Sequence, residues 1–218
     1  RVLDLNPLYI EGGEGGVNTY LKEKSSCLAD RAAMRGREVS HTLVVPGAVT
    51  RKASLGASTI YTVKSPRVPG NPQHRLLVDF RRIGAILREE RPDVVEVDCS
   101  YLLGHVACRA LRERRVPVVG FYHVHLPRLY TRTGRGWIRT EVARRTEGFA
   151  WRYARLCARP CDRVLVTTRE MHDRLKDRGF PRLELVPLGV NLTLFRPRVN
   201  GSRPRVPGID PSRPVVLY

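Results

Sequence analysis

The stretch DVVEVDCSYLLGHVACRALRERRVPVVGFY, residues 93–122, holds two short apolar runs on either side of a helical pattern. The runs Asp93–Val97 and Val116–Tyr122 have the length and composition of buried strands. Between them, apolar residues recur at helical spacing: Leu103, Val106, Ala107, Ala110 and Leu111. A strand, a helix and a second strand in this order predict a crossover between two parallel strands.

The same alternation extends toward the N-terminus. Three further apolar runs predict strands at 2–5, 39–45 and 59–63. Pro46-Gly47 is expected to close the second of them, and the prolines between 66 and 72 predict a loop. Two helical patterns separate these runs, carried by Val17, Tyr20, Leu21, Cys27 and Leu28 and by Leu76, Phe80, Ile83 and Leu87.

The alternation also continues toward the C-terminus. A long basic helix is predicted from Ile138, Val142, Phe149, Tyr153 and Leu156. A strand at 162–166 follows, then a capping box at 167–170 that opens a short helix, with Gly179 at its left-handed end. A last strand is predicted at 183–186. This pattern requires a mostly parallel sheet covered on both faces, so the fold class is α/β.

After Gly189 the alternation stops. Prolines at 197, 204, 207, 211 and 214 indicate a linker. The segment 213–218 then resembles the beginning of another strand, which predicts that the chain is one half of a two-domain protein. The expected organisation is an N-terminal domain at 1–191, an interdomain linker at 192–212 and the first strand of a second domain at 213–218.

Composition excludes several protein classes. With 218 residues, 42% of them hydrophobic, the chain is long enough for one substantial core. No apolar run approaches the roughly 18 residues of a membrane-spanning helix, and the N-terminal strand is too short for a signal peptide. The five cysteines form no C-x-x-C pair, which favours buried free thiols over a metal site. We expect a cytoplasmic location, with peripheral attachment to the inner face of the membrane as an alternative.

The net charge of +18 is typical of proteins that bind nucleic acid. However, 34 of the 39 basic residues are arginine, a bias that a GC-rich coding sequence also produces. The basic residues are spread along the chain without interleaved aromatics. Both observations weaken the nucleic-acid interpretation, so a basic nucleic-acid-binding α/β module is kept only as the alternative function.

Open parallel sheets bind ligands beyond the carboxyl ends of their strands. The loop EGGEGGVN, residues 11–18, follows the first strand and is neither G-x-G-x-x-G, because Asn18 occupies the third glycine position, nor a P-loop. Small residues at a helix N-terminus leave amides that attract an anion, and a mere flexible turn is the alternative. The same edge predicts a substrate cleft with Asn18, Asp98, Tyr101, His125, Thr167 and Arg169.

Three further features have both a functional and an ordinary interpretation. His123 lies at the carboxyl end of the strand at 116–122, where it faces the cleft or is simply a surface histidine. Glu96 and Asp98 share one strand face, but no further ligands accompany them and no metal is predicted. The arginines between 132 and 159 form either a solvated face or a surface that attracts anionic lipid headgroups.

Four segments, in the right order, resemble family-four glycosyltransferases. They are GGVNTYL at 15–21, the aromatic-His-x-x-x-Pro segment FYHVHLP at 121–127, the run VPLGVNLTLFRP at 186–197, and the strand RPVVLY at 213–218. The resemblance spans nearly the whole chain. It implies the N-terminal, acceptor-side half of a GT-B fold, in which two Rossmann-like, doubly wound domains face each other across a cleft.

The resemblance also implies a reaction. Such enzymes are retaining hexosyltransferases that move a sugar from a nucleotide-sugar donor, such as a GDP- or UDP-sugar, to a glycan, lipid or small-molecule acceptor, without a metal or another cofactor. Gly15 and Gly16 would donate amides to the donor diphosphate, and His123 would contact the transferred sugar. The chain's own C-terminal domain and an anionic membrane surface are the other implied partners.

The sequence departs from the family pattern at two places. Asn191 stands where the family usually has Asp, which leaves it a turn role, and Asp98-Cys99-Ser100 differs from what relatives carry there. The family's donor-binding basic residues and its Glu pair belong to the second domain, so the chain alone is expected to be inactive. The glycine spacing and the long first loop disfavour a nicotinamide-dependent oxidoreductase.

Overall fold

The structure is a computed structural model that describes residues 1–13, 15–99, 101–122, 137–193 and 195, excepting the side chains of 137–146. Residues Arg1–Pro187 form one compact unit and Leu188–Tyr218 form a second. Within the described residues, no helix is both long and apolar enough to span a membrane. The predicted linker at 192–212 and strand at 213–218 lie almost wholly outside the described residues and stay predictions.

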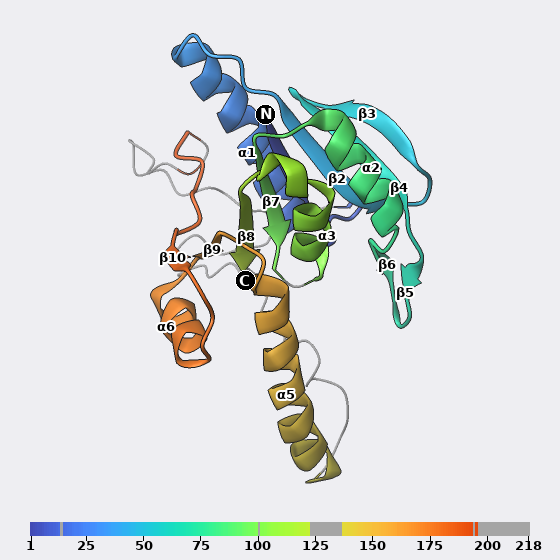
Figure 1. The fold of residues 1–218 in the computed structure, drawn as a ribbon, viewed down its shortest axis with the longest axis vertical. Coiled ribbons are helices and arrows are strands. Elements are labelled where there is room, and N and C mark those ends of the chain that lie inside the picture. Colours follow the sequence, from blue (N-terminus) through green and yellow to red (C-terminus); the bar gives the residue numbers. More distant parts are fainter. Residues whose placement is uncertain (14, 100, 123–136, 194, 196–218) are drawn as a thin grey trace, which may run out of the picture. The chain divides into compact units, whose positions relative to one another are not determined.

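The first unit alternates strands and helices, as the apolar pattern predicts (Figure 1). Its elements are β1 Val2–Leu5, α1 Gly16–Met34, β2 His41–Gly47, β3 Arg51–Leu55, β4 Ser58–Lys64, β5 Arg67–Val68, β6 Asn71–Arg75, α2 Phe80–Glu90, β7 Val94–Asp98, α3 Leu103–Ala110, the 3-10 turn Arg112–Arg114, β8 Val118–Tyr122, α5 Trp137–Ala158, β9 Arg163–Val166, α6 Arg169–Asp177 and β10 Leu183–Leu185.

Eight strands form one sheet in the order β10-β9-β8-β7-β1-β2-β4-β3. Every neighbouring pair is parallel except β3 and β4 at the edge. The strand order reverses at β1, which pairs with β2 on one side and β7 on the other. This arrangement confirms the α/β, Rossmann-like fold class, and its reversal creates the crevice where such sheets bind ligands.

Apolar side chains on both faces of the sheet pack against helices. In β1, Leu3 and Leu5 are buried in the cluster that α2 and α3 share. In β2, Val44 belongs to that cluster, whereas Leu43 and Val45 pack with Leu21 of α1 in a second one. Successive strand residues point to opposite faces, so α1 covers one face while α2 and α3 cover the other.

The structure corrects the sequence prediction at three places. Strand β2 continues through Pro46 and Gly47 instead of ending before them. The edge strand β3 was not predicted, and the expected loop at 66–72 contains most of a two-stranded hairpin, β5–β6. Four of the five residues of β3 are exposed, so this strand has no apolar run that could reveal it.

The start of α6 is also corrected. Thr168, and not Thr167, is the N-cap, and its hydroxyl accepts a hydrogen bond from the Met171 amide at 3.2 Å. The predicted left-handed end is confirmed by Gly179 with φ of 71°. The amides of Gly179 and Phe180 donate back to the last turn, which forms a Schellman motif.

Free thiols account for all five cysteines. Cys99, Cys157 and Cys161 are buried, as predicted, and Cys108 is half-buried. Cys27 is exposed on α1, which corrects the expectation for that residue because the helical stripe that contains it turns outward there.

Candidate functional site

The glycine-rich loop connects β1 to α1 at the point where the strand order reverses. Asn18 holds the loop in shape from the first turn of α1. Its side-chain oxygen accepts from the Ile10 amide at 3.1 Å, and its nitrogen donates to the carbonyls of Ile10 and Gly13 at 2.7 and 2.8 Å. Asn18 is only 4% exposed. The structure therefore gives Asn18 a role in ordering the loop, and its place in the substrate cleft stays a prediction.

Gly15 and Gly16 lie at the exposed end of this loop. Gly15 is the N-cap of α1 and, having no side chain, supplies no cap to the first amides of the helix. A Cβ atom placed on either glycine would meet nothing within 4 Å. The first turn of a helix has amides without intrahelical partners and a positive dipole end. The two glycines thus leave room for an anion to approach the backbone.

The other described site residues lie at the same edge of the sheet. Asp98 ends β7 and is buried, while Tyr101 is half-buried just before α3. Thr167 follows β9, and Arg169 is the exposed first residue of α6. Because β7 pairs with β1, Asp98 ends the strand adjacent to the one that leads into the glycine-rich loop. His123 and His125 fall outside the described residues.

A buried polar network anchors α1 to the sheet behind the loop. The Lys24 ammonium lies 2.8 Å from a carboxylate oxygen of Asp4 in β1 and 2.8 Å from one of Glu96 in β7. Tyr20 donates to the other Glu96 oxygen at 3.1 Å. The ring of His41 also contacts Asp4, lying 3.1 Å from its carboxylate and 2.7 Å from the Ser58 hydroxyl.

Burial and charge compete within this network. Burial would raise the pKa of Asp4, but the Lys24 charge and the hydrogen bond from His41 outweigh it and lower that pKa. Burial raises the pKa of Glu96, and the neighbouring Asp4 charge adds to the rise. Burial would lower the pKa of Lys24, yet the two carboxylates raise it instead. The ammonium is therefore the shared counterion of two carboxylates in one buried cluster.

This network accounts for one of the two acidic residues of β7. The Glu96 carboxylate contacts Lys24 and Tyr20 and thereby helps to hold α1 against the sheet. Sequence reasoning missed the network because its members come from five separate elements, β1, α1, β2, β4 and β7. The signal was present as two isolated carboxylates, Asp4 and Glu96, in otherwise apolar strands.

A cavity of about 420 Å³ opens beside the glycine-rich loop. The loop contributes Tyr9 to Gly13, the end of β2 contributes Pro46, and the β5–β6 hairpin contributes Arg67, Pro72, Gln73 and Arg75. None of the predicted site residues lines it. The sequence did not predict this cavity, because its two arginines belong to a hairpin and the prolines between 66 and 72 indicated a loop there.

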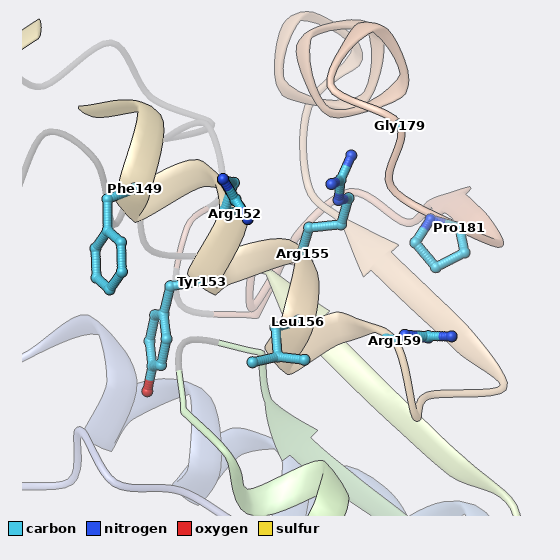
Figure 2. A pocket seen from close by; sticks show the side chains of 8 residues that line it. All are labelled: Phe149, Arg152, Tyr153, Arg155, Leu156, Arg159, Gly179 and Pro181. Atoms are coloured by element: carbon cyan, nitrogen blue, oxygen red, sulfur yellow. The ribbon is translucent and has the colours of Figure 1, made fainter. Parts of the chain in front are cut away.

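A second hollow, about 810 Å³, runs along the C-terminal half of α5 (Figure 2). Arg152, Arg155 and Arg159 line it together with Phe149 and Leu156, whose side chains are 72% and 46% exposed. Arg155 reaches toward Gly179 at the end of α6. Arginines and uncovered apolar side chains therefore share one helix surface.

Comparisons with known proteins agree with this arrangement. The model of Glycosyltransferase Family 4 matches residues 14–194. A GDP-mannose-dependent alpha-mannosyltransferase of Corynebacterium glutamicum is 23% identical over 158 residues, which are 71% of this chain and 36% of that protein. The sucrose-phosphate synthase of Thermosynechococcus elongatus has the same fold, with a TM-score of 0.60 at 15% identity, over 91% of this chain and 50% of that chain.

The chain thus spans about a third of the mannosyltransferase and half of the synthase. The family match begins inside the glycine-rich loop and extends beyond β10, the last strand of the region that alternates strands and helices. This chain belongs to Glycosyltransferase Family 4.

Proposed function

We propose that this chain is the acceptor-side domain of a retaining hexosyltransferase that uses a nucleotide-sugar donor. The open backbone at Gly15 and Gly16, at the start of α1 and at the carboxyl edge of a family-four sheet, carries the proposal. Cleavage of the donor leaves a diphosphate that gains negative charge in the transition state. Amides already aimed at that charge stabilise it without reorganisation.

The remaining parts of the machinery follow from the family. His123 contacts the transferred sugar near its anomeric carbon, and the half-buried and exposed side chains of Tyr101, Thr167 and Arg169 face the acceptor. A second domain of the same protein binds the nucleotide, so the present chain alone does not turn over donor. Transfer proceeds without a metal ion or a further cofactor.

The corynebacterial relative is named for GDP-mannose, which makes that donor the first to test. The full-length protein should release GDP or UDP from one member of a nucleotide-sugar panel in the presence of acceptor, and EDTA should leave the rate unchanged. Proton NMR of the product should show the anomeric configuration of the donor. Inversion would contradict the retaining mechanism, and failure to release nucleotide from any donor would contradict the enzyme itself.

Gly16→Ala in the full-length protein tests the proposed anion site directly. A Cβ atom has free space there within the protein, and alanine is the better helix former, so thermal stability should stay equal or rise. The methyl group would obstruct the diphosphate, so kcat/KM should fall by about 100-fold, the size typical of a lost oxyanion donor. Gly148→Ala, at an exposed position of helix α5 where a Cβ atom would also meet nothing within 4 Å, controls for the substitution as such. Unchanged turnover in Gly16→Ala would remove the loop from the site.

Peripheral contact with an anionic membrane surface is a further part of the proposal. The hollow along α5 combines Arg152, Arg155 and Arg159 with exposed Phe149 and Leu156. Within the described part of the chain, none of these three guanidinium groups is paired with a carboxylate. Basic and apolar side chains on one helix surface suit a headgroup layer with acyl chains beneath it. Such contact would place the enzyme at the inner face of the cytoplasmic membrane.

A further inference from the structure

The hairpin β5–β6 places two positive charges directly opposite each other. Arg67 in β5 is the register partner of Arg75 in β6, so both side chains emerge on the same face of the hairpin. Like charges at such positions destabilise an antiparallel pair. Both arginines line the 420 Å³ cavity beside the glycine-rich loop, which lies within the size range of small-ligand pockets.

No carboxylate of the described residues neutralises this pair. Glu11 also lines the cavity, but its carboxylate lies 2.6 Å from the Arg51 guanidinium and accepts a further bond from the Ala48 amide at 3.3 Å. Arg51 therefore balances Glu11, and the charges of Arg67 and Arg75 remain in excess. The lining of this cavity therefore carries excess positive charge, which suits an anionic ligand.

The cavity is also built to a fixed shape. Arg75 is half-buried, and one of its terminal nitrogens donates to the Ser65 carbonyl at 2.8 Å, which leaves its other donors for a ligand. On the loop side, the Asn18 amide holds the carbonyls of Ile10 and Gly13. A Cβ atom on Gly13 would lie 2.5 Å from a methyl carbon of Ile10, so the loop has no room for a larger residue there.

We propose that this cavity binds the phosphate group of the sugar acceptor, through the guanidinium groups of Arg67 and Arg75. Guanidinium forks match phosphate oxygens in two parallel hydrogen bonds, and two of them suit one doubly charged group. This proposal rests on the proposed function, because it assigns the acceptor of the same reaction. Gly15 and Gly16 serve the donor diphosphate, and the cavity at Gly12 and Gly13 serves the acceptor phosphate on the same loop.

Calorimetry on the full-length protein tests the binding step. Inorganic phosphate and glucose 6-phosphate should both bind the wild type. Their affinity should be about tenfold lower for Arg67→Gln or Arg75→Gln and about 100-fold lower for the double variant. Arg109→Gln, an exposed arginine on α3, is the matched control and should bind as the wild type. Equal affinity in the double variant and the wild type would overturn the proposal, as would a wild type that binds neither probe.

Thermal unfolding separates ligand binding from a structural role. Removing one of two opposed like charges should leave the melting temperature of Arg67→Gln unchanged or higher. A structural arginine would instead lower it. Weak binding together with a lowered melting temperature in Arg67→Gln would therefore overturn the proposed role for that residue.

Transfer assays identify the source of the phosphate. They also separate failure of the acceptor assignment from failure of the proposed function. With the active donor, preference for glucose 6-phosphate over glucose would identify a soluble phosphorylated sugar, and preference for phosphatidylinositol vesicles would identify a lipid headgroup. Equal transfer to phosphorylated and plain sugars would overturn the acceptor assignment while leaving the glycosyltransferase intact. Arginine-dependent phosphate binding without any transfer would contradict the proposed function, and the acceptor assignment with it, while leaving a phosphate-binding site at Arg67 and Arg75.

Discussion

At the scale of single residues, the glycines of this chain serve opposite purposes. Gly15 and Gly16 have empty space around them, so nothing inside the described protein requires a small residue there. Gly120 in β8 is the contrary case. A Cβ atom on Gly120 would collide with the sulfur of Cys99 and would lie 2.9 Å from the sulfur of Cys161. Internal packing explains Gly120, whereas Gly15 and Gly16 are left to the proposed approach of a ligand.

Gly120→Ala should therefore destabilise the protein by about 1–3 kcal/mol, because the added methyl group overpacks a core without voids. Cys99→Ala removes the sulfur that the methyl group strikes. The double variant should recover much of the loss, which chemical denaturation of the four proteins in a double-mutant cycle would measure. If the two substitutions are simply additive, the contact with Cys99 does not determine the glycine.

Some residue roles were visible in the sequence and others were not. The loop at 11–18 was interpreted as an anion site because small residues at a helix N-terminus leave amides that attract an anion, with a flexible turn as the alternative, and this role stays a prediction. Asn191 was assigned a turn role, and its side chain accepts from the Thr193 amide at 3.1 Å. Arg67 and Arg75 gave no signal, because seven residues separate them in the sequence and only the hairpin register brings them opposite each other.

At the scale of elements, apolar content decided what the sequence could predict. The buried strands β1, β4, β7, β8 and β9 were found to within two residues because each is an apolar run. Strand β3 and the hairpin β5–β6 are mostly exposed and polar, and both were missed. Their pairing depends on neighbouring backbone and not on burial. The periodicity of the sequence therefore describes the core and misses the rim, where this family-four domain places a cavity.

The attachment of α1 illustrates a second limit. Leu21 is the largest apolar side chain that α1 buries completely, and polar Asn18 and Ser25 are buried beside it. The helix is held by its charge network as well as by apolar packing, and helical periodicity does not reveal such a network. Because α1 begins at Gly16, whatever positions the helix also positions the proposed anion site.

Lys24→Met should remove the shared counterion and leave Asp4 and Glu96 buried without it. Breaking a buried ion pair by removing one partner costs about 3–5 kcal/mol at neutral pH. The pKa values of both carboxyl groups should then rise above those of the unfolded chain. The folded state would bind more protons than the unfolded one, so the free energy of unfolding should fall as pH rises from 5 to 7.

Urea unfolding of Lys24→Met and wild type at pH 5, 6 and 7 would measure this dependence. Lys22→Met, an exposed lysine on the same helix, should change the free energy of unfolding by less than about 0.5 kcal/mol at each pH. A loss in Lys24→Met that is the same at pH 5 and pH 7 would show that the ammonium does not control the two carboxyl groups.

At the scale of the whole molecule, the positions of the basic residues say more about function than the net charge of +18 does. A basic balance alone favoured nucleic acid as much as any other polyanion, yet the family match supports a glycosyltransferase and nothing in the comparisons supports a nucleic-acid module. The surface carries several arginine groups with different surroundings. Arg81, Arg88 and Arg109 border a hollow between α2 and α3, whereas Arg152, Arg155 and Arg159 border the one along α5.

These two groups allow local and global electrostatics to be separated. Replacing either set of three arginines by glutamine removes the same total charge from the protein. If α5 contacts the membrane, Arg152→Gln/Arg155→Gln/Arg159→Gln should weaken binding to phosphatidylglycerol-containing vesicles by about 100-fold, since each arginine near an anionic surface contributes about 1 kcal/mol. The control Arg81→Gln/Arg88→Gln/Arg109→Gln should lose far less, because these arginines border the hollow between α2 and α3 and not the one along α5.

Sedimentation of full-length protein with vesicles, at low and at physiological salt, measures both triple variants under one condition. Phe149→Ser supplies an uncharged test of the same surface, because its exposed ring would lose burial in the acyl layer without any change in net charge. Weaker binding in Phe149→Ser and in the α5 triple variant alone places the membrane at this helix. Equal losses in the two triple variants would instead assign vesicle binding to the total charge, and the hollow in Figure 2 would then have no membrane role.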